Sequence, residues 1–200
     1  MLILVSTRIA ENHTYPERRD VLSHDWGHLF DRFGLTPILI PNSLWDTTPY
    51  LQLGAKGLLL TGGDSLGSKA APTERDKAEA QLIQGAIEKG LPILGVCRGL
   101  QMLNRYFGGD SIDVTGHVGK HVVKLEDGSR MDVNSFHDQA VTLQGLAKPL
   151  RVFAETEDGI VEGVRHESLP IVAIQWHLER SSPSAAYDEL LIKKWMKECA

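Results

Sequence analysis

The sequence has 200 residues, 42% of them hydrophobic and 24% charged, with a net charge of −5. This length suits a single domain, expected over residues 1–200, whose core needs neither disulfides nor metal. The chain carries no basic stripe of the kind that binds nucleic acid, and no apolar run of the ~18 residues that span a membrane. Its two cysteines, Cys97 and Cys199, are too few for a secreted disulfide scaffold. Residues 1–12 lack the features of a signal peptide, so we expect a cytoplasmic protein without nucleic-acid or membrane partners.

In the first half of the chain, short apolar runs alternate with amphipathic stretches, which is the pattern of βα units around a parallel sheet. The predicted strands cover residues 2–7, 37–41, 57–61 and 91–96. The predicted helices cover residues 17–33, 73–89 and 98–107. The middle helix has the clearest start, because Thr73 and Asp76 form a capping signature, and Gly90 ends it. These elements predict an α/β fold.

The second half of the chain, from about residue 110 to residue 176, consists of short strands and turns. The predicted strands cover residues 122–125, 131–136, 150–156, 159–164 and 170–176. Asp127-Gly128 and Asp158-Gly159 are hairpin signals, so this half of the sheet is expected to be mixed or antiparallel. A last helix is predicted over residues 184–198, and its Leu190, Leu191 and Trp195 could pack on the core or on another subunit.

The stretch GVCRG at residues 95–99 follows a buried strand and opens a helix, which is the setting of a nucleophile elbow. Gly95 and Gly99 make room for the sharp turn, and the helix N-terminus favours the thiolate of Cys97. The backbone N–H of Arg98 is placed to bind a developing oxyanion. A small buried cysteine in a βα turn is the alternative, because the motif alone is short. The strand-turn-helix context favours the nucleophile.

A thiolate nucleophile needs a base, and the base needs a group that orients it. His177 lies just after the apolar run 170–176, and Glu179 follows two residues later. This spacing at a strand end puts both side chains on one side, so Glu179 can hold one imidazole nitrogen while the other faces Cys97. A lone histidine is more often a surface or core residue, but the paired carboxylate makes His177 the strongest of the eight histidines.

Several ordered motifs resemble the class I glutamine amidotransferases, and within them the γ-glutamyl hydrolase branch typified by γ-glutamyl-γ-aminobutyrate hydrolase. The motifs are TGGD (61–64), ERD (74–76), GVCRGLQMLN (95–104), VNSFHDQAV (133–141) and IQWHLE (174–179). The resemblance runs from about Leu58 to Glu179. It implies a three-layer, flavodoxin-like α/β fold with a mainly parallel central sheet and additional antiparallel strands in the second half.

The resemblance also implies a set of site residues. It implies a catalytic triad of Cys97, His177 and Glu179, the same trio that the residues themselves suggest. It implies an oxyanion hole made by the amide of Arg98 and an amide of Gly62 or Gly63, where glycine allows close backbone approach. The implied contacts to the γ-glutamyl group are Gln101, Ser135, Phe136 and His137. Without the resemblance, Gln101 would be read as an exposed helix residue and the other three as a polar turn.

One departure from the family pattern concerns the residue after the catalytic histidine, which is usually proline and here is Leu178. That proline shapes the turn that aims the glutamate, so the position of Glu179 is open. The chain is also shorter than typical hydrolases of this branch, and we expect trimmed loops around its pocket.

The opening stretch 6–26 resembles a subgroup of small hydrolases encoded with bacterial capsule genes. That subgroup removes glutamate from γ-glutamyl-CDP-amidate. The resemblance implies hydrolysis of a γ-glutamyl amide through a γ-glutamyl thioester, with a small-molecule substrate, no cofactor and no metal. A nucleotide leaving group needs cations, and Arg8, at the end of the first strand, is the best candidate. The other flanking candidates are Arg18, Arg19, Lys69, His117, Lys120 and His121.

Several alternatives to this interpretation exist. A glutaminase subunit that supplies ammonia to a synthetase partner would use the same triad, and a homodimer is also open. A degenerate amidotransferase-like binding module is disfavoured, because Cys97, His177 and Glu179 are intact. The pairs His24/His28 and His117/His121 have the i, i+4 spacing of metal ligands on a helix. A zinc site needs a third ligand, so polar helix faces are the preferred interpretation.

Overall fold

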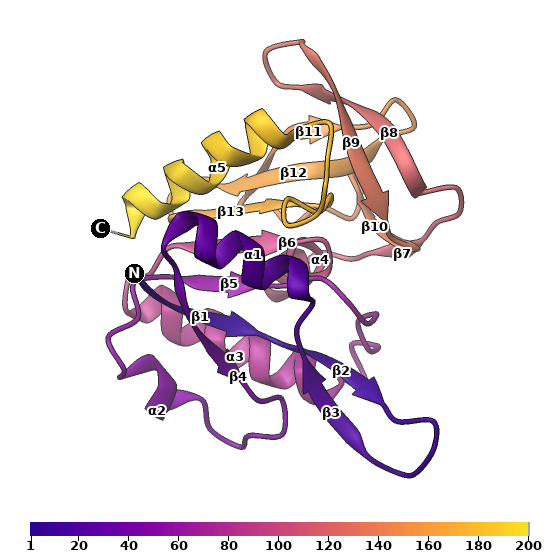
Figure 1. Ribbon diagram of the computed structural model, residues 1–200. Coiled ribbons are helices and arrows are strands. Elements are labelled where there is room, and N and C mark those ends of the chain that lie inside the picture. The colour runs from indigo at the N-terminus through magenta and orange to yellow at the C-terminus, as the bar shows by residue number, and fades with distance from the viewer. Residues whose placement is uncertain (200) are drawn as a thin grey trace.

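Parallel strands form the centre of a mixed sheet (Figure 1), in the order β4-β1-β5-β6-β13. The computed structural model describes residues 1–199. These strands are β1 (Leu2–Ser6), β4 (Thr36–Ile40), β5 (Leu58–Leu60), β6 (Ile93–Val96) and β13 (Ile171–Ile174). All of them lie within or beside the predicted apolar runs. Strands of a parallel core are covered on both faces, which is why they are continuously apolar in sequence.

Antiparallel strands extend the sheet beyond β13, as the hairpin signals predict. They are β12 (Ile160–His166), β11 (Leu150–Glu155), β8 (Val118–Leu125) and β9 (Arg130–Phe136). Two short strands pair at the side of this region, β7 (Ile112–Asp113) and β10 (Gln139–Thr142). The fold is thus the expected α/β fold with a parallel core and antiparallel additions.

Helices cover the sheet on both faces (Figure 1). One face carries α1 (His24–Phe33) and α5 (Ala185–Glu198), and the other carries α2 (Thr48–Leu51), α3 (Glu74–Glu88) and α4 (Arg98–Tyr106). Alternation along β1 separates the two cores, because Ile3 packs with α1 and α5 while Leu4 packs with α3 and α4. Of the apolar residues noted on the last helix, Leu191 and Trp195 are buried in the core and Leu190 is 68% exposed.

The predicted helix over residues 17–33 is wrong in its first part. Residues Arg18–Val21 form β3, which pairs with β2 (Arg8–Glu11) in a hairpin that projects from the sheet (Figure 1). The helix begins only at His24, because the Ser23 hydroxyl accepts a hydrogen bond from the Asp25 backbone and caps it. The apolar spacing of residues 21 and 22 continues that of the helix without being part of it.

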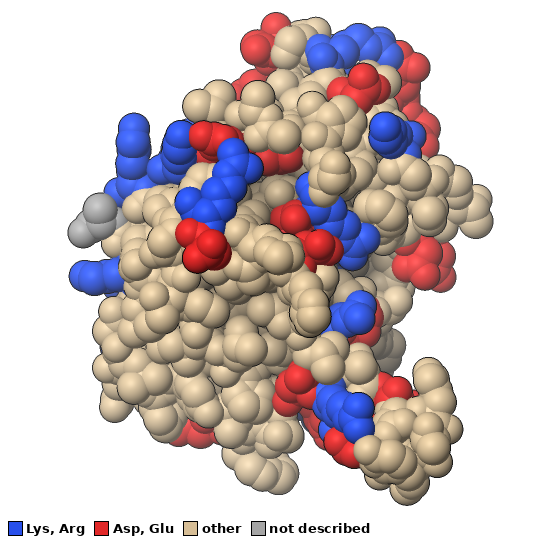
Figure 2. Space-filling model, in the orientation of Figure 1, with Lys and Arg blue, Asp and Glu red and all other residues tan. Residues whose placement is uncertain are grey.

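None of the described helices is long and apolar enough to cross a membrane. On the face that Figure 2 shows, Lys and Arg side chains are interspersed with Asp and Glu rather than gathered in a basic stripe.

Candidate active site

Cys97 lies at the sharp turn between β6 and α4. Its φ of 54° and ψ of −106° make it the one residue other than glycine within residues 1–199 with a positive φ. Such a conformation costs about 1–3 kcal/mol and persists only where the surroundings enforce it. The Cys97 backbone N–H donates to the Ile174 carbonyl at 2.8 Å, which fixes the turn to the end of β13. This is the backbone of a nucleophile elbow.

The two glycines around the turn are required by close packing. A Cβ on Gly99 would lie 2.4 Å from the carbonyl oxygen of Leu60, and one on Gly95 would lie 2.9 Å from the backbone of Gly99. The first turn of α4 therefore rests directly on β5 and β6, with no space for a side chain at either position.

His177 and Glu179 form a close pair beyond the end of β13. The His177 Nδ1 lies 2.6 Å from the Glu179 carboxylate, and both side chains are buried. Asn134 on β9 fixes the backbone on either side of the imidazole, since its side chain bonds the His177 N–H and the His177 carbonyl, each at 2.8 Å. Leu178 is buried in the core, so the residue that replaces the usual proline leaves Glu179 in contact with the histidine.

The His177 imidazole faces Cys97 and the loop of residues 61–64 after β5, called the glycine loop here. A Cβ on Gly62 would lie 2.8 Å from His177 Cε1 and 3.3 Å from Cys97 Cβ. Burial opposes the charged imidazole, but Cys97 and Glu179 outweigh it and raise the pKa of His177 to about 9. Because Glu179 holds Nδ1, Nε2 is the nitrogen left to exchange a proton with the cysteine.

Arg75 on α3 holds the glycine loop through hydrogen bonds from its guanidinium. Its guanidinium donates to the Thr61 carbonyl at 2.7 Å, to the Gly62 carbonyl at 3.2 Å and to the Asp64 carboxylate at 2.7 Å. Gly63 has a φ of 130°, and a Cβ there would lie 2.7 Å from Arg8 Cβ. The loop is thus fixed tightly against the histidine in a conformation that only glycine adopts readily.

The guanidinium of Arg98 points away from the predicted oxyanion position. It is buried against the α3 carboxylates, 2.5 Å from Asp76 Oδ1 and paired with Glu79. Only the backbone of Arg98, at the elbow itself, is therefore placed to serve the site. The side chain instead ties α4 to α3 through a buried ion-pair network.

Gln101 is buried rather than exposed on α4. Its Nε2 donates to the Gln139 carbonyl at 2.7 Å and contacts Gln175 Oε1 at 3.4 Å. The Gln175 side chain in turn donates to Cys97 Sγ at 3.6 Å. Gln101 is thus linked to Cys97 through Gln175, and its contact with substrate stays a prediction.

The Ser135 and His137 side chains both point into the protein interior. The Ser135 hydroxyl donates to the His117 carbonyl at 2.6 Å, and His137 Nε2 faces Glu162 at 3.4 Å, both in the protein interior. Strand alternation explains this, because residue 136 is the one that points outward. Phe136 is 46% exposed and lies edge-on to His177, with ring centroids 5.7 Å apart. Of the three side chains, that of Phe136 alone is exposed, and contact of this segment with the γ-glutamyl group stays a prediction.

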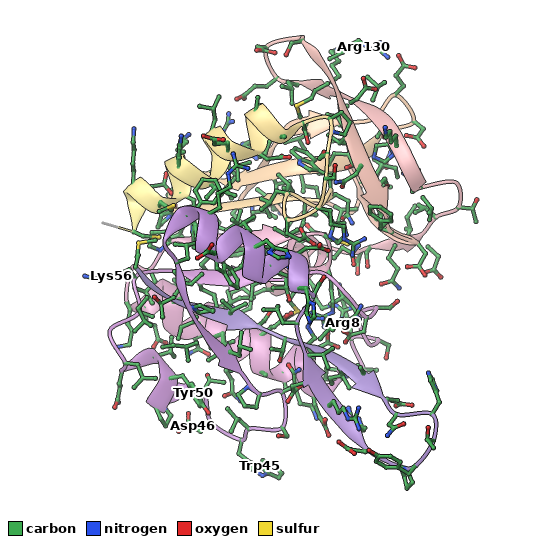
Figure 3. All side chains as sticks on the ribbon, in the orientation of Figure 1. Arg8, Trp45, Asp46, Tyr50, Lys56 and Arg130 are labelled. Atoms are coloured by element: carbon green, nitrogen blue, oxygen red, sulfur yellow. The ribbon has the colours of Figure 1, made fainter. Side chains whose placement is uncertain are left out.

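Arg8 lies at the start of β2, where the chain leaves the parallel core (Figure 3). It lines a small hollow together with Gly62, Gly63, His177 and Glu179. The sheet edge where parallel strands end is the usual ligand site of α/β folds. Three other candidate cations pair with surface carboxylates: Arg18 with Glu74, Arg19 with Glu17, and Lys69 with Asp110.

Three residues near the site were not assigned a role from the sequence: Asn134, Gln175 and Arg75. Each lies inside a motif that carries the family resemblance, but its part depends on side-chain direction. His24 and His28 are both exposed on α1, which agrees with the interpretation of a polar helix face.

A family model described as glutamine amidotransferase class-I matches residues 24–197 of this chain. The chain is similar to γ-glutamyl-CDP-amidate hydrolase of Campylobacter jejuni, with 31% identity over 98% of this chain and 97% of that one. It is also similar to γ-glutamyl-γ-aminobutyrate hydrolase of Escherichia coli O157:H7, with 28% identity over 83% and 81% of the two chains. The crystal structure of a glutamine amidotransferase from Thermotoga maritima shares the fold, with a TM-score of 0.66, 19% identity, and coverage of 96% and 84%. The chain belongs to the class I glutamine amidotransferase family.

Proposed function

We propose that this protein hydrolyses a γ-glutamyl amide bond through a γ-glutamyl thioester on Cys97. The observation that carries the proposal is the meeting of three groups at one sheet edge. These are the strained Cys97 turn, the His177–Glu179 pair, and the glycine loop that lies within van der Waals reach of both. A nucleophile, a base held by a carboxylate, and a narrow backbone loop are the parts that acyl transfer needs.

In the first half-reaction, the Cys97 thiolate attacks the γ-carbonyl carbon. The backbone N–H of Arg98 and an amide of the glycine loop stabilise the resulting oxyanion. The His177 imidazolium protonates the leaving nitrogen as the C–N bond breaks, which leaves the γ-glutamyl thioester. The neutral imidazole then takes a proton from water, which attacks the thioester and releases glutamate.

For the substrate, we propose γ-glutamyl-CDP-amidate, with a role in the biosynthesis of capsular phosphoramidate. The similarity to the Campylobacter jejuni hydrolase over nearly the full length of both chains supports this choice. The position of Arg8 beside the glycine loop supports it as well, because a cation there can meet a diphosphate.

A glutaminase subunit that passes ammonia to a synthetase partner is the second candidate. The match to the glutamine amidotransferase family model supports it, since the triad chemistry of the two functions is the same. Such a subunit would prefer glutamine and would depend on its partner for full activity.

Kinetics on three substrates separates these functions. We expect kcat/KM for γ-glutamyl-CDP-amidate to exceed the values for glutamine and γ-glutamyl-γ-aminobutyrate by at least about 100-fold. We also expect Arg8→Ala to raise KM for the nucleotide substrate alone, whereas Arg151→Ala, at an exposed arginine paired with Glu167, leaves it unchanged. The highest kcat/KM on glutamine would support the glutaminase function instead, and an unchanged KM in Arg8→Ala would remove Arg8 from the site.

A further inference from the structure

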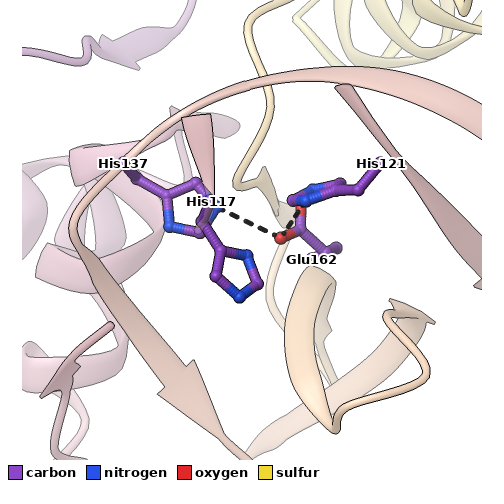
Figure 4. A group of neighbouring side chains, drawn as sticks. All are labelled: His117, His121, His137 and Glu162. Carbon is purple, nitrogen blue, oxygen red and sulfur yellow. Dashed lines mark ion pairs between the residues drawn. The ribbon is translucent and has the colours of Figure 1, made fainter. Parts of the chain in front are cut away.

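Three histidines and a glutamate converge in the antiparallel half of the protein, outside the triad (Figure 4). His117 precedes β8, His121 lies on β8, His137 follows β9 and Glu162 lies on β12. One ligand atom from each of the four lies within 4.8 Å of all the others. The spacing of His117 and His121 suggested that they share a helix, but the structure has no helix there. The two histidines instead lie close to two candidate ligands, His137 just after β9 and Glu162 on β12.

Two of the spacings between these atoms match those around a tetrahedral zinc ion. Glu162 Oε1 lies 3.2 Å from His121 Nε2 and 3.4 Å from His137 Nε2. With bonds of about 2.0–2.1 Å, neighbouring ligand atoms of a tetrahedral zinc ion are about 3.3 Å apart. Imidazole nitrogen and carboxylate oxygen are also ligand types that zinc accepts.

The inward-facing atoms have no other partner in the described part of the chain. His117 Nδ1, His121 Nε2, His137 Nε2 and both Glu162 oxygens are buried and form no hydrogen bond among residues 1–199. His121 and His137 approach Glu162 at ion-pair distances, but these contacts fall outside hydrogen-bond geometry. Each unsatisfied buried polar group costs about 1–3 kcal/mol, so a cluster of them calls for a shared partner.

The outer nitrogens of two histidines are held as they are in metal sites. His137 Nδ1 lies 3.1 Å from the Gln139 carbonyl, which can only accept, so this nitrogen carries the proton. His117 Nε2 lies 3.2 Å from the Asp158 carboxylate and donates to it. In the neutral form of each ring, the remaining nitrogen offers a lone pair to the cluster, which it faces. Such outer acceptors orient metal-binding histidines.

We propose that His117, His121, His137 and Glu162 bind a zinc ion. Four protein ligands close a tetrahedral shell, which is the arrangement of structural rather than catalytic sites. The ion would join β8, the turn between β9 and β10, and β12. Gln139, the first residue of β10 after this turn, accepts the hydrogen bond from Gln101, so the metal would brace the segment that holds Gln101 without taking part in the reaction.

Titration of the chelator-stripped full chain tests the site. We expect uptake of about one zinc ion per chain. We also expect a higher Tm with zinc, and visible absorption bands of tetrahedral Co²⁺ when cobalt replaces zinc. Glu162→Gln and His121→Ala should each lower zinc affinity by at least about 100-fold, and Asp158→Asn by about 10- to 100-fold. His13→Ala, at an exposed histidine outside the cluster, is the matched control and should bind as the wild type does.

Two results would overturn the proposal. One is a wild-type chain that takes up no zinc or cobalt and keeps the same Tm. The other is a set of ligand variants that bind as tightly as His13→Ala. If the ligand variants fail to fold, the wild-type titration and cobalt spectrum still decide. Hydrolase activity is not a readout, so this test is independent of the proposed function.

Discussion

Cys97 occupies a backbone conformation that side chains rarely adopt, and its neighbours hold it there. The hydrogen bond from its N–H to the Ile174 carbonyl and the close packing of Gly95 and Gly99 hold the turn in this backbone conformation. The strain presents the sulfur to His177 at the ends of the parallel strands. Strain of this kind is the expected price of a preorganised nucleophile.

The raised pKa of His177 leads us to expect that both the activity and the free energy of unfolding depend on pH. Relative to the ordinary value of 6.5, the fold raises this pKa to about 9 and so favours the imidazolium. Its contribution to the free energy of unfolding is therefore complete below about pH 6.5 and is lost as the pH rises through about 9. In the proposed mechanism the imidazolium also protonates the leaving nitrogen, so we expect kcat/KM to fall on the alkaline side with an apparent pKa of about 9.

Glu179→Gln tests the origin of that alkaline limb. The substitution removes a carboxylate that helps to raise the pKa of His177, so the limb should move to lower pH. Glu157→Gln, at an exposed glutamate paired with Arg130, should leave the profile where it is. An alkaline limb that stays in place or moves to higher pH in Glu179→Gln would contradict this assignment.

We expect Arg75 to be a positioning residue that acts on the proposed reaction through the glycine loop. Lysine cannot bond the Thr61 and Gly62 carbonyls in the fork geometry of a guanidinium. Arg75→Lys should therefore lower kcat by about 10- to 100-fold with little change in KM. Steady-state kinetics beside a Tm measurement checks this, with Arg151→Lys as the surface control. A kcat equal to the control's, or a rise in KM alone, would rule out the positioning role.

At the residue level, the sequence predicts which residues form the candidate triad better than it predicts the directions of the neighbouring side chains. The elbow and the His-x-Glu spacing are local patterns, and the structure brings Cys97, His177 and Glu179 together. The directions of the Ser135 and His137 side chains depend on which face of β9 is buried, and a motif alone does not specify this. Asn134 and Gln175 act through long-range hydrogen bonds, which sequence spacing does not reveal.

Among the elements, the contact between α4 and β5 positions the nucleophile. Gly99→Ala would place a Cβ 2.4 Å from the Leu60 carbonyl, so the helix must shift and carry the elbow with it. We expect a lower Tm and a large loss of kcat. Gly27→Ala is the matched control, because its Cβ meets nothing within 4 Å on the exposed face of α1. That change should raise stability by about 0.5–1 kcal/mol, measured by denaturant unfolding. Equal effects of the two substitutions would contradict this packing account.

Periodicity predicts the buried parallel strands and fails where two structures share a spacing. Residues four apart lie on one face of a helix, and also on one face of a strand, because four is an even number. The spacing of His117 and His121 is therefore compatible with a helix and with a strand. The structure forms the strand, since β8 begins directly after His117 and contains His121. The helix predicted over residues 17–33 fails for a related reason, since it extends an apolar pattern across the Ser23 cap into β3.

In the whole molecule, the two halves of the sheet contribute different groups to the candidate active site. The parallel half supplies the edge where Cys97, Gly62 and His177 meet. The antiparallel half supplies Asn134, which holds the His177 backbone, and the proposed zinc cluster that braces the neighbouring turn. Composition and hairpin signals predict this division, but not the hydrogen bonds that join the halves, because they link residues more than 40 positions apart.

Trapping the covalent intermediate tests the central claim most directly. The chain is mixed rapidly with γ-glutamyl-CDP-amidate, quenched in acid and analysed by mass spectrometry, intact and after digestion. We expect one added γ-glutamyl group on the peptide that contains Cys97. Cys97→Ala should form no adduct and lose turnover by about 10⁴-fold or more. Cys199→Ala should behave as the wild type, because burial raises the pKa of the Cys199 thiol to about 12. Wild-type turnover in Cys97→Ala, or an adduct on another residue, would contradict the account.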